Sequence, residues 1–241
     1  MEWDAPAIVL AARAYGEGDA VATVLTAEHG AHRGLARGGA SRSKAATWQP
    51  GNLLQTRWVA RLHDQLGAFT AELVHPGAAL AMDDPLALAV LSSACAVAEG
   101  ALTEREPHPD VFAGLLNVIT RLAAGPAVLT DLIRWELALL RELGYGLTLD
   151  RCAVTGDADG LAWVSPRTGR AVSDAAAGPW KERLLPLPPF LHGAEPDAAQ
   201  WSAGLALTGH FLARSAFGAQ RQSVPPARDW LSDRVAAMAL A

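Results

Sequence analysis

Residues 29–63 read HGAHRGLARGGASRSKAATWQPGNLLQTRWVARLH and contain no aspartate or glutamate. Six fixed positive charges lie in this acid-free stretch, at Arg33, Arg37, Arg42, Lys44, Arg57 and Arg61. Because the formal net charge of the whole chain is −5, the rest of the chain carries a net charge of about −11, a segregation that solubility alone does not require. The stretch therefore predicts an anionic partner, and its short apolar runs predict that it forms one face of a small β-barrel.

Apolar runs separated by turn residues continue this pattern on both sides of the stretch. They are centred on residues 8–10, 21–25, 31–37, 53–59 and 67–74, and the breaks between them are mostly rich in glycine. Five short strands in so few residues predict a closed barrel, because closure removes the exposed edges of a sheet. We therefore expect a five-stranded OB-fold β-barrel over residues 1–77.

Beyond residue 77 the apolar residues recur at every third or fourth position, which is typical of helices. Asp83-Asp84-Pro85 has the character of a helix start, and the helix that follows is expected to end near Gly100. Further helices are expected over residues 110–123, 126–144 and 197–217 and after Pro225-Pro226. Residues 150–190, rich in Gly, Asp, Ala and Pro, read as an irregular insert. The sequence thus predicts an α+β chain with a mostly α-helical domain over residues 78–241.

Composition places the chain among ordinary globular proteins, with 51% hydrophobic and 19% charged residues. No apolar run approaches the roughly 20 residues of a membrane-spanning helix, and the amino terminus lacks the basic start and apolar segment of a secretory signal. Two cysteines, Cys95 and Cys152, are too few for a disulfide framework. We therefore expect a cytoplasmic address.

Catalytic signatures are missing from the sequence: it contains no Walker-type loop, no nucleophile elbow and no His-Glu-x-x-His motif. His29 and His32 are close enough to share a metal, but only one carboxylate lies nearby, and exposure in a turn explains them equally well. Glu104 and Glu106 lie in a predicted loop, where solvation explains them. We expect no enzymatic activity and no cofactor; a hydrolase or transferase without a visible motif is the weaker alternative.

The spacing of the cations suggests how an anion would bind. Arg33 and Arg37 are four residues apart, which places both on one face of a strand, and Arg57 and Arg61 repeat this spacing. Together these pairs would form a track for phosphate groups. The small, polar and basic segment at residues 40–46 has the composition of a mobile loop that would close over the track.

Aromatic and basic residues elsewhere would extend this surface. Trp48 and Trp58 alternate with the cations and would serve as stacking platforms for the bases of a single strand; alternatively, Trp58 is a core residue and Trp48 a loop anchor. Arg214, Arg221 and Arg228 would form a secondary DNA-binding patch, although charge compensation at a helix C-terminus explains the first two as well.

Three segments resemble the RecO family of bacterial recombination mediators. They are residues 30–38 (GAHRGLARG) with the basic loop and Trp48-Gln49-Pro50 behind them, residues 135–145 (WELALLRELGY) and residues 149–156 (LDRCAVTG). The last two, adjacent and in this order, are the most specific. The resemblance spans most of the chain, as far as Phe211-Leu212-Ala213-Arg214.

This resemblance implies an amino-terminal OB barrel on a helical domain. It further implies a nucleoid-associated protein of the RecF pathway of DNA repair that binds single- and double-stranded DNA and anneals complementary strands. With RecR, and in many bacteria RecF, it would help load RecA onto DNA coated by single-stranded-DNA-binding protein, whose carboxy-terminal tail the helical domain would hold. No membrane partner is implied. The alternative is a protein-interaction scaffold without direct DNA binding, in which the charge of the barrel is incidental.

One departure from the family concerns metal. Many members hold zinc with two Cys-x-x-Cys pairs in the insert, whereas here Cys152 is followed at that spacing by Thr155, and the later pair would fall near Ser173 and Ala176. Structural zinc requires four Cys or His ligands, so we predict no zinc and a Cys152 that is only a small residual side chain. The insert would then be shaped by packing of its two tryptophans, Trp163 and Trp180.

Overall fold

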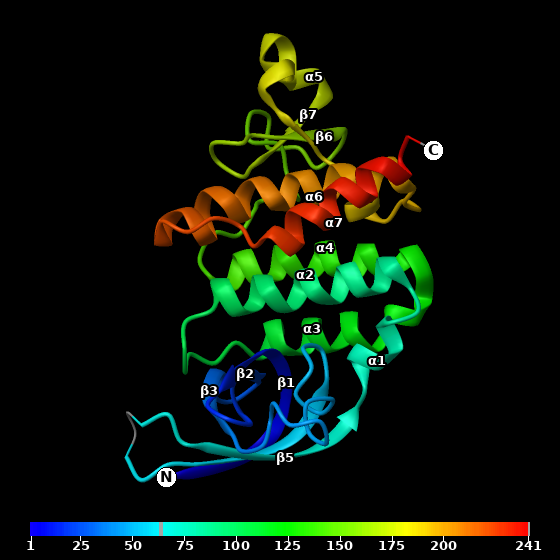
Figure 1. The fold of residues 1–241 in the computed structure, drawn as a ribbon. Coiled ribbons are helices and arrows are strands. Elements are labelled where there is room, and N and C mark those ends of the chain that lie inside the picture. The colour runs from blue at the N-terminus through cyan, green and yellow to red at the C-terminus, as the bar shows by residue number, and fades with distance from the viewer. Residues whose placement is uncertain (63–64, 241) are drawn as a thin grey trace. The chain divides into compact units, whose positions relative to one another are not determined.

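The structure is a computed structural model that describes residues 1–62 and 65–240; His63, the last residue of the acid-free stretch, lies outside them. The chain divides into two compact units, Met1–Val128 and Leu129–Ala241. The first contains a closed five-stranded barrel followed by helices, and the second is mostly helical with a small sheet (Figure 1). The expected fold class, a barrel followed by a mostly α-helical region, is confirmed.

The barrel is built from β1 (Glu2–Tyr15), β2 (Asp19–Thr26), β3 (Gly30–Ala36), β4 (Leu53–Val59) and β5 (Ala68–His75), in the order β1-β2-β3-β5-β4. Strand β1 is long enough to pair with two neighbours. Its first half pairs with β4, and its second half, from Ile8 onward, pairs with β2, with a shift in register between Val9 and Ala11. A short parallel pairing of β3 with β5 completes the ring. This is the five-stranded arrangement expected of an OB-type barrel.

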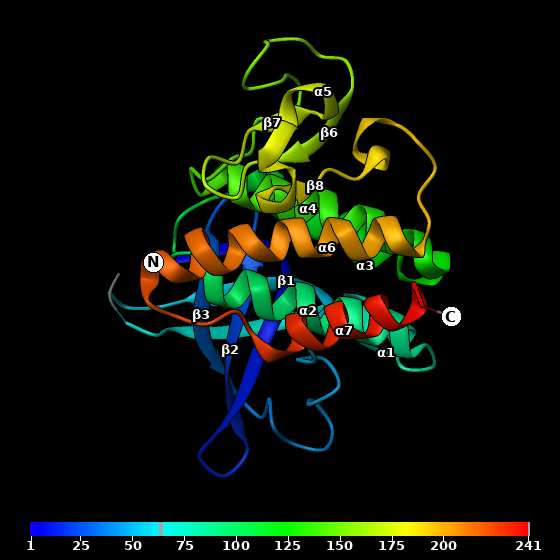
Figure 2. The same cartoon turned by 90° about the horizontal axis from the view of Figure 1, so that it is seen from above.

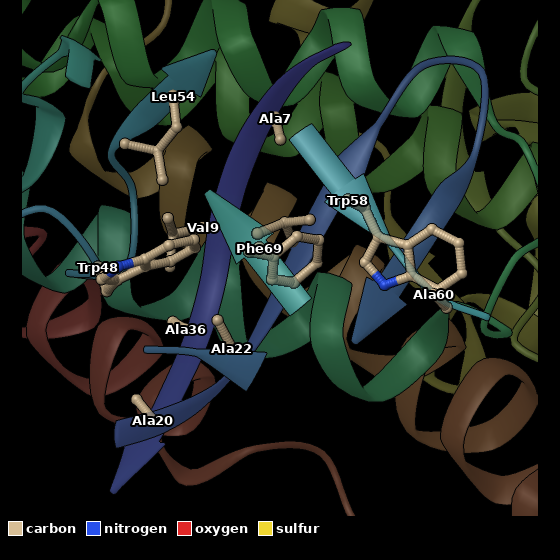
Figure 3. Close-up of a cluster of buried hydrophobic side chains, with 11 residues drawn as sticks. Ala7, Val9, Ala20, Ala22, Ala36, Trp48, Leu54, Trp58, Ala60 and Phe69 are labelled. Carbon is tan, nitrogen blue, oxygen red and sulfur yellow. The ribbon is translucent and has the colours of Figure 1, made fainter. Parts of the chain in front are cut away.

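Alternating side chains from all five strands fill the barrel, as the pleat of a strand dictates. Its core consists of Ala7, Val9, Ala20, Ala22, Val24, Ala36, Trp48, Leu54, Trp58, Ala60 and Phe69 (Figure 3). The small residues make room for the three aromatic rings. Gly34 lies directly against the Phe69 ring, where a Cβ atom would stand only 2.7 Å from a ring carbon. A larger residue at position 34 would therefore displace this ring.

Helices α1 (Gly77–Ala81), α2 (Pro85–Ala101) and α3 (Pro109–Thr120) and the 3-10 helix η1 (Leu122–Ala127) complete the first unit. The carboxylate of Asp84 caps α2 by accepting hydrogen bonds from the backbone N–H groups of Leu86 and Ala87, at 2.7 and 3.3 Å. Helix α2 packs on β1, and the Cys95 thiol lies 3.7 Å from the Val9 carbonyl. The helix start expected at Asp84-Pro85 is confirmed.

The second unit contains α4 (Val128–Glu142), α6 (Ala198–Phe211) and α7 (Pro226–Met238), with α6 and α7 packed side by side (Figure 2). After Phe211 the chain continues as a π-helical turn, η4 (Leu212–Phe217), and a 3-10 turn, η5 (Gly218–Gln220). These elements confirm the helices expected in this region. Across residues 1–62 and 65–240 we find no helix whose length and apolar character would allow it to cross a bilayer.

The insert is more regular than its composition suggests. Strands β6 (Leu161–Val164), β7 (Ala171–Ser173) and β8 (Leu185–Pro186) form a sheet in the order β7-β6-β8. The short helices α5 (Asp174–Ala177), η2 (Gly178–Arg183) and η3 (Pro189–His192) alternate with or follow these strands (Figure 2). The sequence did not predict this sheet within the irregular insert, because strands of two to four residues are too short to show an alternating pattern.

Candidate nucleic-acid interface

A groove runs on the barrel between the segment after β3, the end of β4 and the first residues of β5. This basic groove has a volume of about 550 Å³ and is lined by Arg37, Lys44, Thr47, Trp48, Val59, Ala68, Phe69, Thr70 and Ala71. Arg37 and Lys44 are both exposed, and neither has an acidic partner among residues 1–62 and 65–240. The groove therefore combines two uncompensated cations with hydroxyl groups and apolar surface, which suits a phosphate backbone.

Hydrogen bonds hold the basic side of the groove in shape. The Asp19 carboxylate accepts a hydrogen bond of 2.7 Å from the backbone N–H of Gly38, and the Ser41 hydroxyl donates one of 2.6 Å to the Gly38 carbonyl. Further along, the Asn52 amide donates to the carbonyls of Ala46 and Thr47 at 2.8 and 3.1 Å. The segment expected to be a mobile loop is thus a series of hydrogen-bonded turns that positions Lys44.

Two arginines of the acid-free stretch are neutralised by acids from other parts of the chain. Arg33 forms an ion pair of 2.8 Å with Glu104, and Arg57 forms one of 2.6 Å with Glu2. The hydrogen bond and the charge of Arg57 hold the pKa of the Glu2 carboxyl below its ordinary value. These two arginines therefore present little net charge to an incoming anion in this conformation.

The expected two-strand track of cations does not form. Strand β3 ends at Ala36 and β4 ends at Val59, so Arg37 and Arg61 each lie beyond the strand that was expected to carry them. In addition, β5 lies between β3 and β4 in the barrel. The structure instead brings Arg37 together with Lys44, while Arg42 and Arg61 are exposed outside the groove.

Trp48 and Trp58 are core residues rather than exposed platforms. Their side chains are only 5% and 3% exposed. The Trp48 ring stacks on Phe69 with 5.8 Å between ring centroids (Figure 3). The Trp58 ring stacks on Trp3 at 6.1 Å. The Trp58 indole N–H also donates a hydrogen bond to the Leu66 carbonyl at 3.1 Å. The expectation of stacking platforms is corrected, because both rings are buried against other aromatic rings of the barrel; Trp48 also lines the basic groove.

The three arginines that were expected to form a secondary DNA-binding patch have different surroundings. Arg228 is 1% exposed and forms a buried ion pair with Glu136, so it is a structural residue and not a surface cation. Arg214 donates hydrogen bonds to the carbonyls of Pro166 and Arg167. Arg221 is exposed and ends η5 in the left-handed conformation, with φ at +57°. The three therefore do not form one patch.

Donor atoms in the insert do not fit a zinc ion. Cys152 is the sole thiol there, and its sulfur accepts hydrogen bonds from the backbone N–H of Val154 and from both the N–H and the hydroxyl of Ser173, at 3.3 to 3.5 Å. Hydrogen bonds from the N–H groups of Ser173 and Thr155 lower the pKa of the Cys152 thiol to about 6.

Cys152 is 2% exposed and packs with Val172 and Ala177 at the centre of the insert. It therefore organises this core, which is more than the residual small side chain that was expected. Trp163 packs at the edge of the same core and donates a hydrogen bond of 2.8 Å to Asp174, whereas Trp180 is 60% exposed. The expected packing role is thus wrong for Trp180.

Sequence reasoning missed the residues that reach the interface from a distance. Glu2 and Glu104 neutralise arginines that lie 55 and 71 positions away along the chain. Thr70 lines the groove from β5, and Asp19 anchors it from β2. No local pattern marks any of the four, because each acts through a pairing that only the closed barrel creates.

Comparisons with known proteins agree over almost the whole chain. A family model described as "Recombination protein O N terminal" matches residues 1–76, and one described as "Recombination protein O C terminal" matches residues 82–224. The chain is 60% identical to the DNA repair protein RecO of Granulibacter bethesdensis over 99% of its own length and 97% of that protein. It is 57% identical to the DNA repair protein RecO of Acidiphilium cryptum, covering 98% of the chain and 96% of that protein.

Proposed function

The chain belongs to the RecO family of DNA repair proteins, and on that premise we propose that it is a non-enzymatic recombination mediator. In this proposal it binds single- and double-stranded DNA, anneals complementary strands and helps load RecA onto DNA coated by single-stranded-DNA-binding protein. RecR is the proposed protein partner, with RecF in addition in many bacteria. The tail of single-stranded-DNA-binding protein is the proposed ligand of the helical domain.

The observation that carries the DNA-binding part of this proposal is the pairing of Arg37 with Lys44 in the basic groove. Lys44 lies close enough to Arg37 for its ammonium group to donate to the Arg37 carbonyl, at 3.4 Å. Two neighbouring cations without an acidic partner among the described residues repel each other until an anion binds between them. A phosphodiester backbone supplies such anions at regular spacing, whatever the base sequence.

Charge neutralisation by this groove also explains how the protein would promote annealing. Two complementary strands repel each other through their phosphates, and cations bound to one strand reduce that repulsion. Contacts to phosphate leave the pairing edges of the bases free, because they involve only the backbone of the strand. A strand held in this way would remain available to its complement.

The experiment that tests the proposal compares wild type with Arg37→Gln/Lys44→Gln in DNA binding and strand annealing. The matched control is Lys181→Gln/Arg183→Gln, which removes one lysine and one arginine from exposed positions of the insert. We expect the groove variant to lose affinity and annealing rate, and the control to retain both. Thermal melts of all three proteins establish that they are folded.

If the folded wild-type protein does not bind DNA in a salt-dependent manner, the proposal is contradicted. It would favour a protein-interaction scaffold whose barrel charge is incidental. Equal losses in the groove variant and in the control would mean that overall charge, and not the groove, governs binding.

A further inference from the structure

Glu104 places its carboxylate between two arginines on the barrel unit. One carboxylate oxygen, Oε2, lies 3.0 Å from Nε and 2.8 Å from Nη2 of Arg33. The other oxygen, Oε1, lies 4.0 Å from Nε of Arg105. Arginine binds phosphate through the same guanidinium N–H groups. The carboxylate of Glu104 therefore occupies the position in which these arginines would hold a phosphate.

The backbone, and not only the side chain, keeps Glu104 at this position. Glu104 forms an isolated parallel bridge with Ala31, and the Arg105 N–H donates a hydrogen bond of 2.7 Å to the Ala31 carbonyl. Arg105 has a φ of +66°, a conformation that a residue with a side chain rarely adopts. Only a glycine at position 30 lets this segment come so close, because a Cβ atom there would stand 2.0 Å from the Glu106 carbonyl oxygen. Strand β3 and the segment after α2 thus fix the backbone of Glu104 beside Arg33.

The other acid that pairs with an arginine of the stretch has a more exposed side chain. Glu2 contacts Arg57 at 2.6 Å from near the start of the chain, and its side chain is 60% exposed, against 33% for Glu104. Beside the Glu104 pair lies an open hollow of about 480 Å³, lined by Arg33, Leu66, Glu104 and Arg105. A nucleotide backbone thus has room to approach the two arginines once the carboxylate moves.

We propose that Arg33 and Arg105 form a latent phosphate site for DNA, and that Glu104 occupies it as an internal phosphate mimic in the DNA-free protein. The inference rests on the proposed DNA-binding function and deepens it. DNA binds first at the Arg37 and Lys44 groove, where no acid must be displaced. It gains the contact with Arg33 only when its phosphate replaces the Glu104 carboxylate, so Glu104 limits affinity.

The test measures binding of a fluorescently labelled oligothymidine at several salt concentrations by anisotropy. The proteins are wild type, Glu104→Gln, Arg33→Gln and the double variant. We expect Glu104→Gln to bind about three- to tenfold more tightly and to steepen the log–log salt dependence by about 0.7, the value for one added phosphate contact on a single strand. Arg33→Gln is expected to weaken binding only slightly in wild type and strongly in the Glu104→Gln background.

Glu72→Gln is the matched control, since Glu72 is an exposed acid on β5 without an ion-pair partner among the described residues. It removes the same charge from the same unit and should change affinity less than Glu104→Gln does. Thermal melts check each protein, and Glu104→Ala replaces Glu104→Gln if that variant does not fold.

Either of two results would overturn the inference but leave the proposed function standing. One is a Glu104 variant that binds DNA like wild type, and the other is a gain in affinity that persists when Arg33 is also replaced. If neither wild type nor the Glu104 variants bind DNA in a salt-dependent manner, the proposed function fails and the inference fails with it.

Discussion

Arg228 and Glu136 lie 92 positions apart in the sequence, and their side chains form a buried ion pair. Nε of Arg228 lies 2.5 Å from Oε1 of Glu136, and its Nη2 lies 3.0 Å from Oε2. The carbonyl of Leu205 and the hydroxyls of Thr208 and Ser232 accept further hydrogen bonds from the guanidinium group. The pair therefore ties α7 to α4 and α6, with every charge partnered.

Removal of one partner should destabilise the second unit. Arg228→Ala leaves the Glu136 carboxylate buried without its counter-charge, and we expect a loss of about 3–5 kcal/mol in the free energy of unfolding. Arg228→Met/Glu136→Leu should recover most of this loss, because neither charge then remains buried. Urea unfolding measures both. Arg221→Ala, at an exposed arginine, is the control and should change stability by about 0.5 kcal/mol or less. A similar small effect of Arg228→Ala would contradict the structural role.

Lys44 and Arg57 should differ in their contribution to DNA binding although each carries one positive charge. Lys44 faces the basic groove without an acidic partner among the described residues, whereas Arg57 is paired with Glu2. We expect Lys44→Gln to reduce the log–log salt dependence of single-strand binding by about 0.7. Arg57→Gln should change this salt dependence much less, because Glu2 already neutralises the charge of Arg57. Equal slopes for the two variants, measured by salt titration, would remove the basis for assigning the groove.

Trp58 should govern stability. Its ring is buried in the barrel core, so Trp58→Ala is expected to lower the free energy of unfolding by about 3–5 kcal/mol. Trp230, which is 71% exposed on α7, provides a control of the same residue type, and Trp230→Ala should cost about 0.5 kcal/mol or less. Chemical denaturation compares the two. A stable Trp58→Ala protein that had lost DNA affinity would instead restore Trp58 as a stacking platform.

Cys152 should make stability depend on pH. Its pKa is lowered to about 6 from an ordinary value of 9.0, so between these values the unfolded chain binds more protons than the folded one. The stabilisation is fully present above pH 9 and is lost as the pH falls through about 6. The difference in unfolding free energy between wild type and Cys152→Ala should therefore shrink from pH 9 to pH 6.

Cys95 supplies the comparison for this pH dependence, because burial raises the pKa of its thiol to about 12. The difference between wild type and Cys95→Ala should stay constant from pH 6 to about 8 and begin to fall near pH 9, opposite to the trend for Cys152→Ala. A constant difference for Cys152→Ala as well would show that its thiol is not ionised, and ultraviolet absorbance of the thiolate would report this independently.

The helices and most strands follow from local patterns. Asp84 and Pro85 mark the start of α2, because capping by a carboxylate and the fixed φ of proline act within one turn. The strands of the barrel likewise show their alternation over several residues. The sheet of the insert could not be predicted in this way, because β7 and β8 contain only three and two residues and are held by pairing with β6.

The candidate interface, too, could be predicted only in part from local sequence patterns. The acid-free stretch indicates an anionic partner by composition alone, and Arg37 and Lys44 do lie together in a groove. Which other cations remain available depends on acids brought from distant positions: Glu104 reaches Arg33, and Glu2 reaches Arg57. Likewise, the burial of Trp48 follows from closure of the barrel, which no local spacing records.

By itself the sequence determined the class of the chain, the positions of its main helices and strands, its family resemblance and the segregation of positive charge into residues 29–63. These properties depend on residue types and on spacings of a few residues. Only the tertiary structure decided which cations are free, which tryptophans are buried and why Arg228 is a structural residue. The physical reason is that ion pairing and burial depend on distance in space, and folding brings together side chains as far apart as Arg228 and Glu136.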